Sequence, residues 1–276
     1  MFKSLKNNNI TRGKNKVKFL DDKVDAKILL FDIETAPNLS YTWGKWQQDV
    51  IDFKDHWYML CYAAKWLDDG KMITSKLTDY NSFKKDKTDD FNVVKSLWTL
   101  LDKADIVITH NGDEFDIKKA NARFVYHGLP PPSPYKTIDT KKVAKKYFSF
   151  TSNSLNDLGR YLKLGEKVKH EGFDLWLNCM TGEKKAWETM IKYNKQDVIL
   201  LEKIYKRFLS WITNHPNLGL YKKLDFACPN CGSQHLNHRG FNYTKTNTYR
   251  RVQCVDCHAW SQYTTSEKRL KNKIKN

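Results

Sequence analysis

Asp32 and Glu34 carry carboxylates that can hold a divalent metal ion. They lie two positions apart in segment 27–35, Lys-Ile-Leu-Leu-Phe-Asp-Ile-Glu-Thr. The apolar run before Asp32 predicts a buried strand, and alternate residues of a strand point to the same face. Two carboxylates side by side on a buried strand repel each other, which indicates a divalent cation between them. The alternative for this segment alone is that the acids mark the end of a strand where it meets water.

Asp116 is a third acid in a position typical of a functional site. It follows an apolar strand predicted at 105–110 and an Asn-Gly turn signal. It lies in the first turn of a helix predicted over 114–127, for which Asp113 is the expected N-terminal cap. Helices in such sheets begin at the carboxyl ends of strands, where binding sites gather. The alternative is an acid favoured only by the helix dipole.

Asp197 and Tyr193 lie in a long helix predicted over 183–211. They are four residues apart and share a helix face, close to the face of the apolar Met190 and Leu201. An acid on an inward-looking face needs a partner that compensates its burial. On its own, Asp197 is also explained as an edge residue of an amphipathic helix.

The order of these motifs resembles the signature of the DEDD superfamily of 3′–5′ exonucleases. The motifs are Phe-Asp-Ile-Glu-Thr at 31–35, His-Asn-Gly-Asp-Glu-Phe-Asp at 110–116 and Tyr-x-x-x-Asp at 193–197. The chain is similar to the tyrosine subgroup (DEDDy), which includes the proofreading domains of family-B DNA polymerases and stand-alone, phage-type relatives. Lys192 stands where the histidine subgroup would need histidine, which favours this subgroup. Over residues 25–212 the resemblance implies an α/β fold, a ribonuclease-H-like mixed five-stranded sheet flanked by helices.

The resemblance implies catalytic roles for five residues: Asp32, Glu34, Asp116, Tyr193 and Asp197. The four acids would hold two Mg²⁺ or Mn²⁺ ions, which suit oxygen ligands and clamp the attacking and leaving oxygens of a phosphodiester. Tyr193 and Glu34 would orient the attacking water. Asn111 and Phe115 would lie near the terminal nucleotide as substrate-binding residues. Asp139, an acid outside the motifs, is interpreted as structural.

The implied function is hydrolysis at the 3′ ends of nucleic acid with release of 5′-mononucleotides, DNA being favoured over RNA. A net charge of +17, from 48 Lys and Arg against 31 Asp and Glu, favours a polyanionic partner. A lysine-rich surface that serves solubility is the alternative. Two other functions remain open: a structure-specific, metal-dependent endonuclease, and a non-catalytic nucleic-acid-binding subunit of a replication or recombination assembly. The expected protein partner is a polymerase or another replication or recombination protein.

Four of the six cysteines form two C-x2-C pairs: Cys228, Cys231, Cys254 and Cys257. Four thiolates suit one structural Zn²⁺ in a closed tetrahedral site, and a redox pair is the alternative. The spacing resembles a zinc ribbon, with a hairpin formed by 236–244 and 248–253. His258 stands where the second knuckle usually has Gly, a position that often needs positive φ.

Basic residues of this C-terminal region are candidates for contacts with a phosphate backbone. They are Arg239, Lys245, Arg250 and Arg251. The alternatives are a mini-domain whose basic residues are only solvated, or one that contacts a protein.

The elements that must position the acids follow from the hydrophobic pattern. Strands are predicted at 27–35, 57–66, 71–77, 105–110 and 137–140, and helices at 89–101, 114–127, 141–148 and 183–211, with another ending at Leu162. The expected organisation is a basic, flexible segment 1–24, an exonuclease domain 25–212, a linker 213–224, a zinc ribbon 225–265 and a basic tail 266–276. The sequence has no 18-residue apolar run and no signal-peptide core, so we expect a cytoplasmic protein (in the host cytoplasm if phage-encoded) without a membrane partner.

Overall fold

The computed structural model describes residues 25–46, 49–67 and 69–269. The expected basic segment 1–24 and residues 270–276 of the expected tail lie outside the described residues. Three sheets are present in the described part of the chain, with five, three and two strands. None of the helices in this part combines the length and apolar character needed to span a bilayer.

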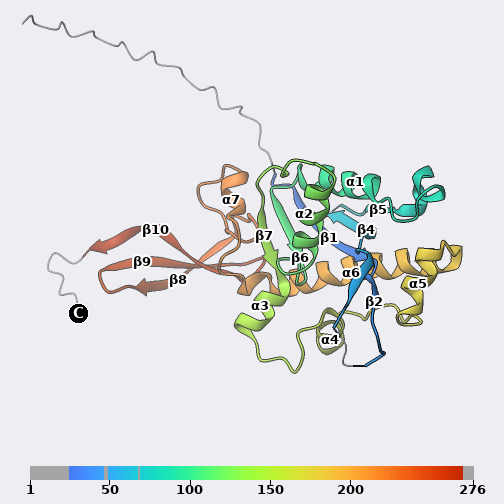
Figure 1. The fold of residues 1–276 in the computed structure, drawn as a ribbon. Helices are drawn as coiled ribbons and strands as arrows, with labels where there is room; N and C mark the ends of the chain where they lie inside the picture. The colour runs from blue at the N-terminus through green and yellow to red at the C-terminus, as the bar shows by residue number, and fades with distance from the viewer. Residues whose placement is uncertain (1–24, 47–48, 68, 270–276) are drawn as a thin grey trace, which may run out of the picture.

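The five-stranded sheet is built around β1, and its order is β5-β4-β1-β6-β7. The strands are β1 (Ile28–Thr35), β4 (Met59–Trp66), β5 (Met72–Lys76), β6 (Ile106–Thr109) and β7 (Lys136–Asp139). β1 pairs antiparallel with β4 and parallel with β6, and β7 is parallel to β6. The sheet is therefore mixed, and helices flank it, which confirms the predicted ribonuclease-H-like fold class and all five predicted strands (Figure 1).

Helices surround this sheet, and the longest, α6, packs against β1 and β4. The α-helices are α1 (Phe91–Leu101), α2 (Asp116–Tyr126), α3 (Thr140–Tyr147), α4 (Leu155–Tyr161), α5 (Asp174–Thr181), α6 (Lys184–Phe208) and α7 (Leu218–Tyr221). The 3₁₀ helices are η1 (Leu77–Asp79), η2 (Asn81–Lys84) and η3 (Leu209–Trp211).

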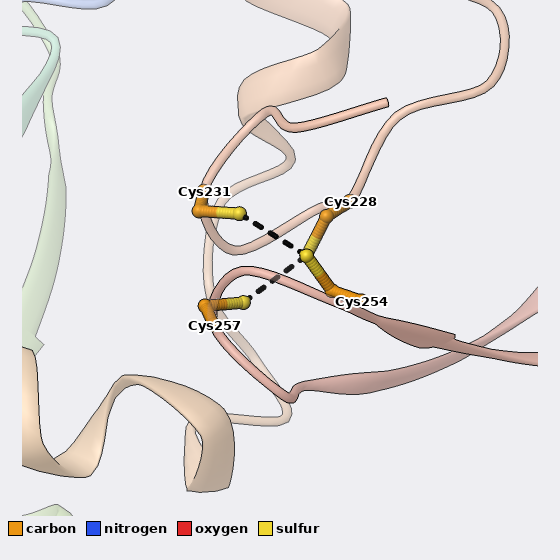
Figure 2. A group of neighbouring side chains, drawn as sticks. All are labelled: Cys228, Cys231, Cys254 and Cys257. Carbon is orange, nitrogen blue, oxygen red and sulfur yellow. Dashed lines mark hydrogen bonds between the residues drawn. The ribbon is translucent and has the colours of Figure 1, made fainter. Parts of the chain in front are cut away.

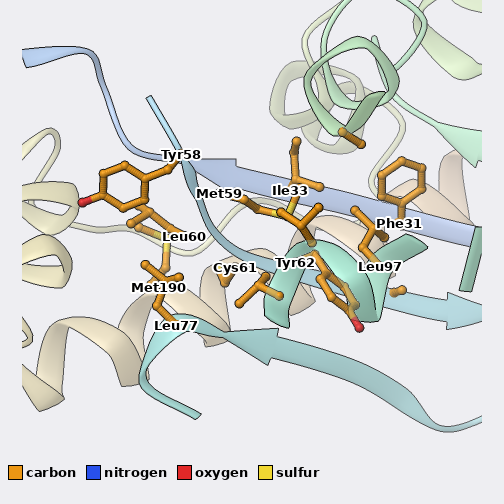
Figure 3. Close-up of a cluster of buried hydrophobic side chains, with 14 of the residues drawn as sticks. Phe31, Ile33, Tyr58, Met59, Leu60, Cys61, Tyr62, Leu77, Leu97 and Met190 are labelled. Carbon is orange, nitrogen blue, oxygen red and sulfur yellow. The ribbon is translucent and has the colours of Figure 1, made fainter. Parts of the chain in front are cut away.

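Two apolar clusters line the two faces of β1. Leu29, Phe31 and Ile33 belong to the cluster drawn in Figure 3, together with residues of α1, α2 and the first half of α6. Ile28 and Leu30 belong to the second cluster, together with residues of α3, α4 and the second half of α6. Because side chains alternate along a strand, Asp32 and Glu34 continue the row of Ile28 and Leu30.

Three details of the part of the chain around the five-stranded sheet differ from the sequence prediction. α2 begins at Asp116, with Phe115 at its N-cap, because the Asp113 carboxylate pairs with Lys142 Nζ at 2.8 Å instead of capping the helix. The α-helix α6 ends at Phe208, before the predicted end at 211, and the last three residues form the 3₁₀ turn η3. The hairpin of β2 (Leu39–Tyr41) and β3 (Asp52–Asp55) and the helix α5 were not predicted, since all three elements are short.

The C-terminal sheet is a separate antiparallel unit of order β10-β9-β8. Its strands are β8 (Leu236–Tyr243), β9 (Asn247–Cys254) and β10 (Trp260–Arg269). The predicted hairpin corresponds to β8 and β9, whereas β10 was not predicted because its polar sequence lacks an apolar alternation. Figure 1 shows this sheet projecting from the body at the end of α6 opposite α5. At its root, Asn230 Nδ2 donates to the carbonyl oxygens of Leu209 at 2.7 Å and Ile212 at 3.0 Å.

Candidate active site and cysteine cluster

β1 and α6 bring three of the predicted acids together. Asp32, Glu34 and Asp197 each place a carboxylate oxygen within 4.8 Å of the others. The two β1 acids face α6 because they share the strand face of Ile28 and Leu30, which packs in the same cluster as Val198 and Leu201 of that helix. Tyr193, four residues before Asp197, is buried beside it. Residues far apart in the sequence thus form one group of acids.

Asp116 lies at the edge of this group. Its Oδ1 atom accepts a hydrogen bond from the backbone N–H of Ile33 at 3.1 Å, between the two β1 acids. Burial is the main cause of the raised pKa of Asp32, and the charge of Asp116 is the second largest cause. Asp116 is not one of the three acids within 4.8 Å of one another. Its position therefore fixes the end of β1 and adds negative charge beside the acid triad.

Two polar side chains that were not predicted hold the acids in place. Asn194 Nδ2 donates to Asp32 Oδ2 at 2.6 Å and to the Asp32 carbonyl at 3.2 Å. Lys167 Nζ donates to Asp197 Oδ2 at 2.5 Å and to the Tyr193 hydroxyl at 2.9 Å. Asn194 was detectable as a residue three positions before Asp197 on the same helix, whereas Lys167 lies in a segment without regular structure and carried no local signal.

An aromatic group covers the Glu34 side of the site. Burial raises the pKa of Glu34, and the indole of Trp176 in α5, next to this carboxylate, acts in the opposite direction and lowers it. The rings of His170 and Tyr193 meet edge to face with centroids 4.9 Å apart, and Trp176 lies 6.1 Å from Tyr193. These rings pack against Tyr193 and orient its ring beside the acids.

The acids are held in an environment that disfavours their charges. Burial and then the charge of Asp116 hold the pKa of Asp32 well above its usual range. Burial, followed by the charge of Asp197, raises the pKa of Glu34 to about 8. Burial raises the pKa of Asp116 to about 7 in spite of the hydrogen bond from Ile33. Such a site is stabilised by positive charge.

One positive charge in the site comes from Lys167. Burial alone would lower the pKa of Lys167, but the charge of Asp197 raises it, so the ammonium stays charged.

The acids also fit divalent cations. Oδ1 of Asp197 is buried and has no hydrogen-bond partner. Carboxylate oxygens are the ligands that Mg²⁺ and Mn²⁺ prefer. Asp197 Oδ1 is therefore free to act as a ligand of such an ion, which would compensate the burial of this oxygen.

We expect Glu34 and Asp116 to make the folded protein less stable in Mg²⁺-free buffer as the pH rises from 6.5 to 8. The pKa values of Glu34 and Asp116 are about 8 and about 7, well above the unfolded values of 4.5 and 3.8. The folded state therefore holds protons that the unfolded state has released. Each such proton lowers the free energy of unfolding by up to about 1.4 kcal/mol for each unit that the pH rises. His110, whose pKa burial lowers to about 4, does not contribute above its unfolded value of 6.5.

Thermal unfolding between pH 6.5 and 8 checks this expectation. Saturating Mg²⁺ should flatten the pH dependence, because bound cations favour the ionised acids at every pH in this range. An Asp116→Asn variant should show a smaller slope without Mg²⁺. An Asp116→Asn variant whose melting temperature depends on pH as that of the unmodified, Mg²⁺-free protein does would contradict the electrostatic description of the site.

The two predicted substrate-binding residues lie on the loop before α2. Asn111 has φ +72°, and its backbone N–H donates to Asp139 Oδ1 at 2.9 Å. Phe115 is 39% exposed and immediately precedes Asp116. Asp139 also accepts from the backbone N–H of Lys141 at 2.9 Å and caps α3, which supports the structural role expected for it.

The four cysteines of the C-terminal region form one compact cluster (Figure 2). Sγ of Cys228 lies 3.5 Å from Sγ of Cys257, and Sγ of Cys231 lies 3.6 Å from Sγ of Cys254. A tetrahedral Zn²⁺ with Zn–S bonds of about 2.3 Å sets its sulfur atoms about 3.8 Å apart. The cluster therefore fits one four-coordinate Zn²⁺. The two remaining cysteines, Cys61 and Cys179, are buried in the main core.

The two cysteine turns have matching backbones. Gly232, directly after Cys231, has φ +73°, and His258, directly after Cys257, has φ +62°. In each turn the N–H of this residue donates to the carbonyl of the first cysteine, at 2.8 Å for Gly232 and 3.1 Å for His258. His258 thus occupies the positive-φ position anticipated from the sequence.

The four predicted basic residues lie on β8 and β9 of the projecting sheet or in the turn between these two strands. Arg251 stacks over the Trp260 ring at 4.7 Å, and Arg250 lies over the Phe241 ring at 5.9 Å. Arg239 and Lys245 are exposed on β8 and in the turn after it. Basic groups alternate here with exposed aromatic rings, an arrangement suited to contacts with phosphates and bases.

Comparisons with known proteins bear on the main domain. The sequence profile of RNase_H_2, in the RNase_H superfamily, matches residues 55–209. This range contains Asp116, Tyr193 and Asp197 and begins after Asp32 and Glu34. A search of curated proteins finds no match.

Among solved structures, the chain is similar to the family B DNA polymerase from the hyperthermophilic archaeon Pyrobaculum calidifontis. The TM-score is 0.51 and the sequence identity is 14%, over 80% of this chain and 31% of the polymerase. At this identity the similarity shows a shared fold. The chain matches less than a third of the polymerase's length.

Proposed function

The chain belongs to the RNase_H superfamily, and on this basis we propose that it is a metal-dependent 3′–5′ exonuclease of the tyrosine (DEDDy) subgroup. It would hydrolyse phosphodiester bonds at the 3′ ends of nucleic acid, with DNA favoured, and release 5′-mononucleotides. The observation that carries the proposal is the group of Asp32, Glu34 and Asp197, whose carboxylate oxygens lie within 4.8 Å of one another beside Tyr193, with Asp197 buried and the other two acids half-buried. Asp116, which bonds the backbone of β1 between the first two acids, completes the set.

In this proposal, Asp32, Glu34, Asp116 and Asp197 hold two Mg²⁺ or Mn²⁺ ions. When bound, these ions would activate a water and stabilise the leaving 3′-oxygen. The chain's own groups would place the reactants. Asn194 fixes the carboxylate of Asp32 through two hydrogen bonds. The Tyr193 hydroxyl, held by Lys167, and the Glu34 carboxylate, held by Trp176, would orient the attacking water.

Asn111 and Phe115 would contact the terminal nucleotide. Both lie on the loop that leads into Asp116, and the partly exposed ring of Phe115 is available for stacking. A 3′ end placed against this loop would lie next to the acids, which is the position that an exonuclease requires.

The cysteine cluster would hold one structural Zn²⁺, and the ribbon around it would bind nucleic acid. Zinc in a closed four-cysteine site has no open position for chemistry, so its contribution would be folding energy. The corresponding organisation is an exonuclease domain over 25–212, a linker over 213–224 and a zinc ribbon over 225–265. A polymerase or another replication or recombination protein would be the protein partner that presents the 3′ end.

A pair of labelled oligonucleotides tests the direction of cleavage. We expect Mg²⁺- or Mn²⁺-dependent release of mononucleotides from a single strand with a free 3′ hydroxyl, and none from the same strand with a blocked 3′ end. Product length is read by gel electrophoresis, with single-stranded DNA, duplex DNA and RNA compared side by side. Internal cleavage of the blocked strand would support an endonuclease and contradict the proposal.

A further inference from the structure

Four aromatic rings form a continuous row beside the second half of α6. The ring centroids lie 5.2 Å apart for Trp211 and Phe148, 5.1 Å for Phe148 and Phe150, and 5.4 Å for Phe150 and Tyr161. The rings come from the end of η3, the segment after α3 and the end of α4, and α3 and α4 both pack against α6. We call these four residues the aromatic row.

The two ends of the aromatic row are open to solvent. Tyr161 is 70% exposed and Trp211 is 52% exposed. Phe148 and Phe150 are half-buried and rest on the buried ring of Phe208, whose centroid is 5.0 Å from the first and 6.1 Å from the second. Contiguous apolar surface that is rimmed by polar residues marks an interaction site. Phe208 thus holds the middle of the row in place, while the end rings stay accessible to a ligand.

The segments that carry the row are rich in basic residues. Residues 140–156, 158–165 and 203–213 contain nine basic residues and no Asp or Glu. The basic residues are Lys141, Lys142, Lys145, Lys146, Arg160, Lys163, Lys203, Lys206 and Arg207. Four acids border these segments, and each is already hydrogen-bonded or ion-paired: Asp139, Asp157, Glu166 and Glu202. Positive charge beside aromatic rings is the arrangement that binds the phosphates and bases of nucleic acid.

One end of the row lies between the acids and the C-terminal sheet. Trp211 follows Asp197 by 14 positions along α6 and η3, which corresponds to about 20 Å at about 1.5 Å per helical residue. Asn230, at the root of the C-terminal sheet, donates to the carbonyl of Ile212, the residue after Trp211, at 3.0 Å. A strand that runs from the acids to the basic residues of this sheet would pass the exposed ring of Trp211.

The middle of the row is tied to the loop before α2. Asn153 lies three residues after Phe150, and its carbonyl accepts a hydrogen bond from His110 Nε2 at 3.0 Å. His110 directly precedes Asn111, which belongs to that loop. The position of the row relative to the acids is therefore fixed from two sides, through α6 and through this segment.

We propose that the aromatic row is a remote second site that stacks bases of the substrate strand, well to the 5′ side of the bond that is cleaved. Bases stacked at about 3.4 Å per nucleotide cover about 20 Å in about six nucleotides. The inference rests on the proposed function for the position of the 3′ end, and it adds a length requirement. A strand too short to span this distance reaches the acids without reaching the row. Hydrolysis should therefore slow once the substrate has been shortened to this length.

The test compares hydrolysis of a thymidine tetramer and a thymidine hexadecamer by the full chain in Mg²⁺. Trp211→Ala should raise KM for the hexadecamer about 5- to 100-fold, the range expected for losing one base–aromatic stack, and should leave kcat unchanged. KM for the tetramer should stay the same, because the tetramer does not reach Trp211. Tyr161→Ala removes the exposed ring at the other end of the row and should act in the same way.

Tyr126→Ala is the matched control, because Tyr126 is 71% exposed but lies at the end of α2, outside the row. It should leave both KM values unchanged. Binding of the hexadecamer is measured in parallel by fluorescence anisotropy in Mg²⁺-free buffer. Weaker binding by the two row variants, without any hydrolysis by the unmodified chain, would refute the exonuclease and keep the row. Hydrolysis with unchanged KM and binding in both variants, or an equal loss on both substrates, overturns the inference and leaves the row to a protein partner.

Discussion

An Asp197→Ala variant is expected to lose 3′–5′ exonuclease activity by at least about 10³-fold while the protein stays folded. Asp197 is 2% exposed, and its Oδ1 atom is buried without a partner within the acid group. Removing it would take away a ligand of an ion that stabilises transition-state charge by several kcal/mol, and about 4 kcal/mol corresponds to about 10³-fold in rate. The measurement is the initial rate of mononucleotide release from a 3′-labelled single strand in saturating Mg²⁺.

The folded state should tolerate this change for an electrostatic reason. Burial raises the pKa of Asp197, and the neighbouring acids repel it, so its removal relieves repulsion in the metal-free protein. In the variant, Asp32 and Glu34 still compensate the charge of the Lys167 ammonium, which lowers the pKa of both acids. Glu188→Ala is the matched control, an exposed acid on the same helix, and should keep full activity. Wild-type activity in pure, folded Asp197→Ala protein would refute the assignment of the acid group as the catalytic centre.

A Cys254→Ser variant is expected to lose bound zinc, from one ion per chain to essentially none, and to unfold the C-terminal sheet. Cys254 ends β9 and is 1% exposed, and its Sγ lies 3.6 Å from that of Cys231. The apolar cluster around it is small, with Cys228 and Ala259 as its other fully buried members. A sheet with so little core depends on metal binding, which in zinc-finger peptides contributes about 10–16 kcal/mol.

Elemental analysis measures the zinc, and hydrogen exchange locates the unfolding. Protection should disappear from β9 and remain in β1 and β4, because their core lies in the main sheet. Cys179→Ala, a buried cysteine outside the cluster, should keep the zinc. A purified chain without zinc, or a Cys254→Ser variant that retains it, would exclude the proposed metal centre.

The parts of the site that were predictable from the sequence are those in which one element carries the whole pattern. Asp32 and Glu34 share a face because strands repeat every two residues, and Tyr193 and Asp197 share one because helices repeat every 3.6. The five strands of the main sheet were predictable for the same reason. Asp113 was a reasonable helix cap by local rules, but Lys142, 29 residues away, draws its carboxylate into an ion pair.

By itself, the sequence determined which acids share a strand or helix face and the two C-x2-C motifs, because these depend on local spacing, while the ribonuclease-H-like fold class followed from the resemblance of the ordered motifs. Only the tertiary structure decided which acids meet and what surrounds them. Asp32, Glu34 and Asp197 converge while Asp116 bonds the Ile33 backbone, and Lys167, Asn194 and Trp176 hold the group. These contacts join residues up to 162 positions apart, and side chains brought together by packing leave no periodic trace in the chain.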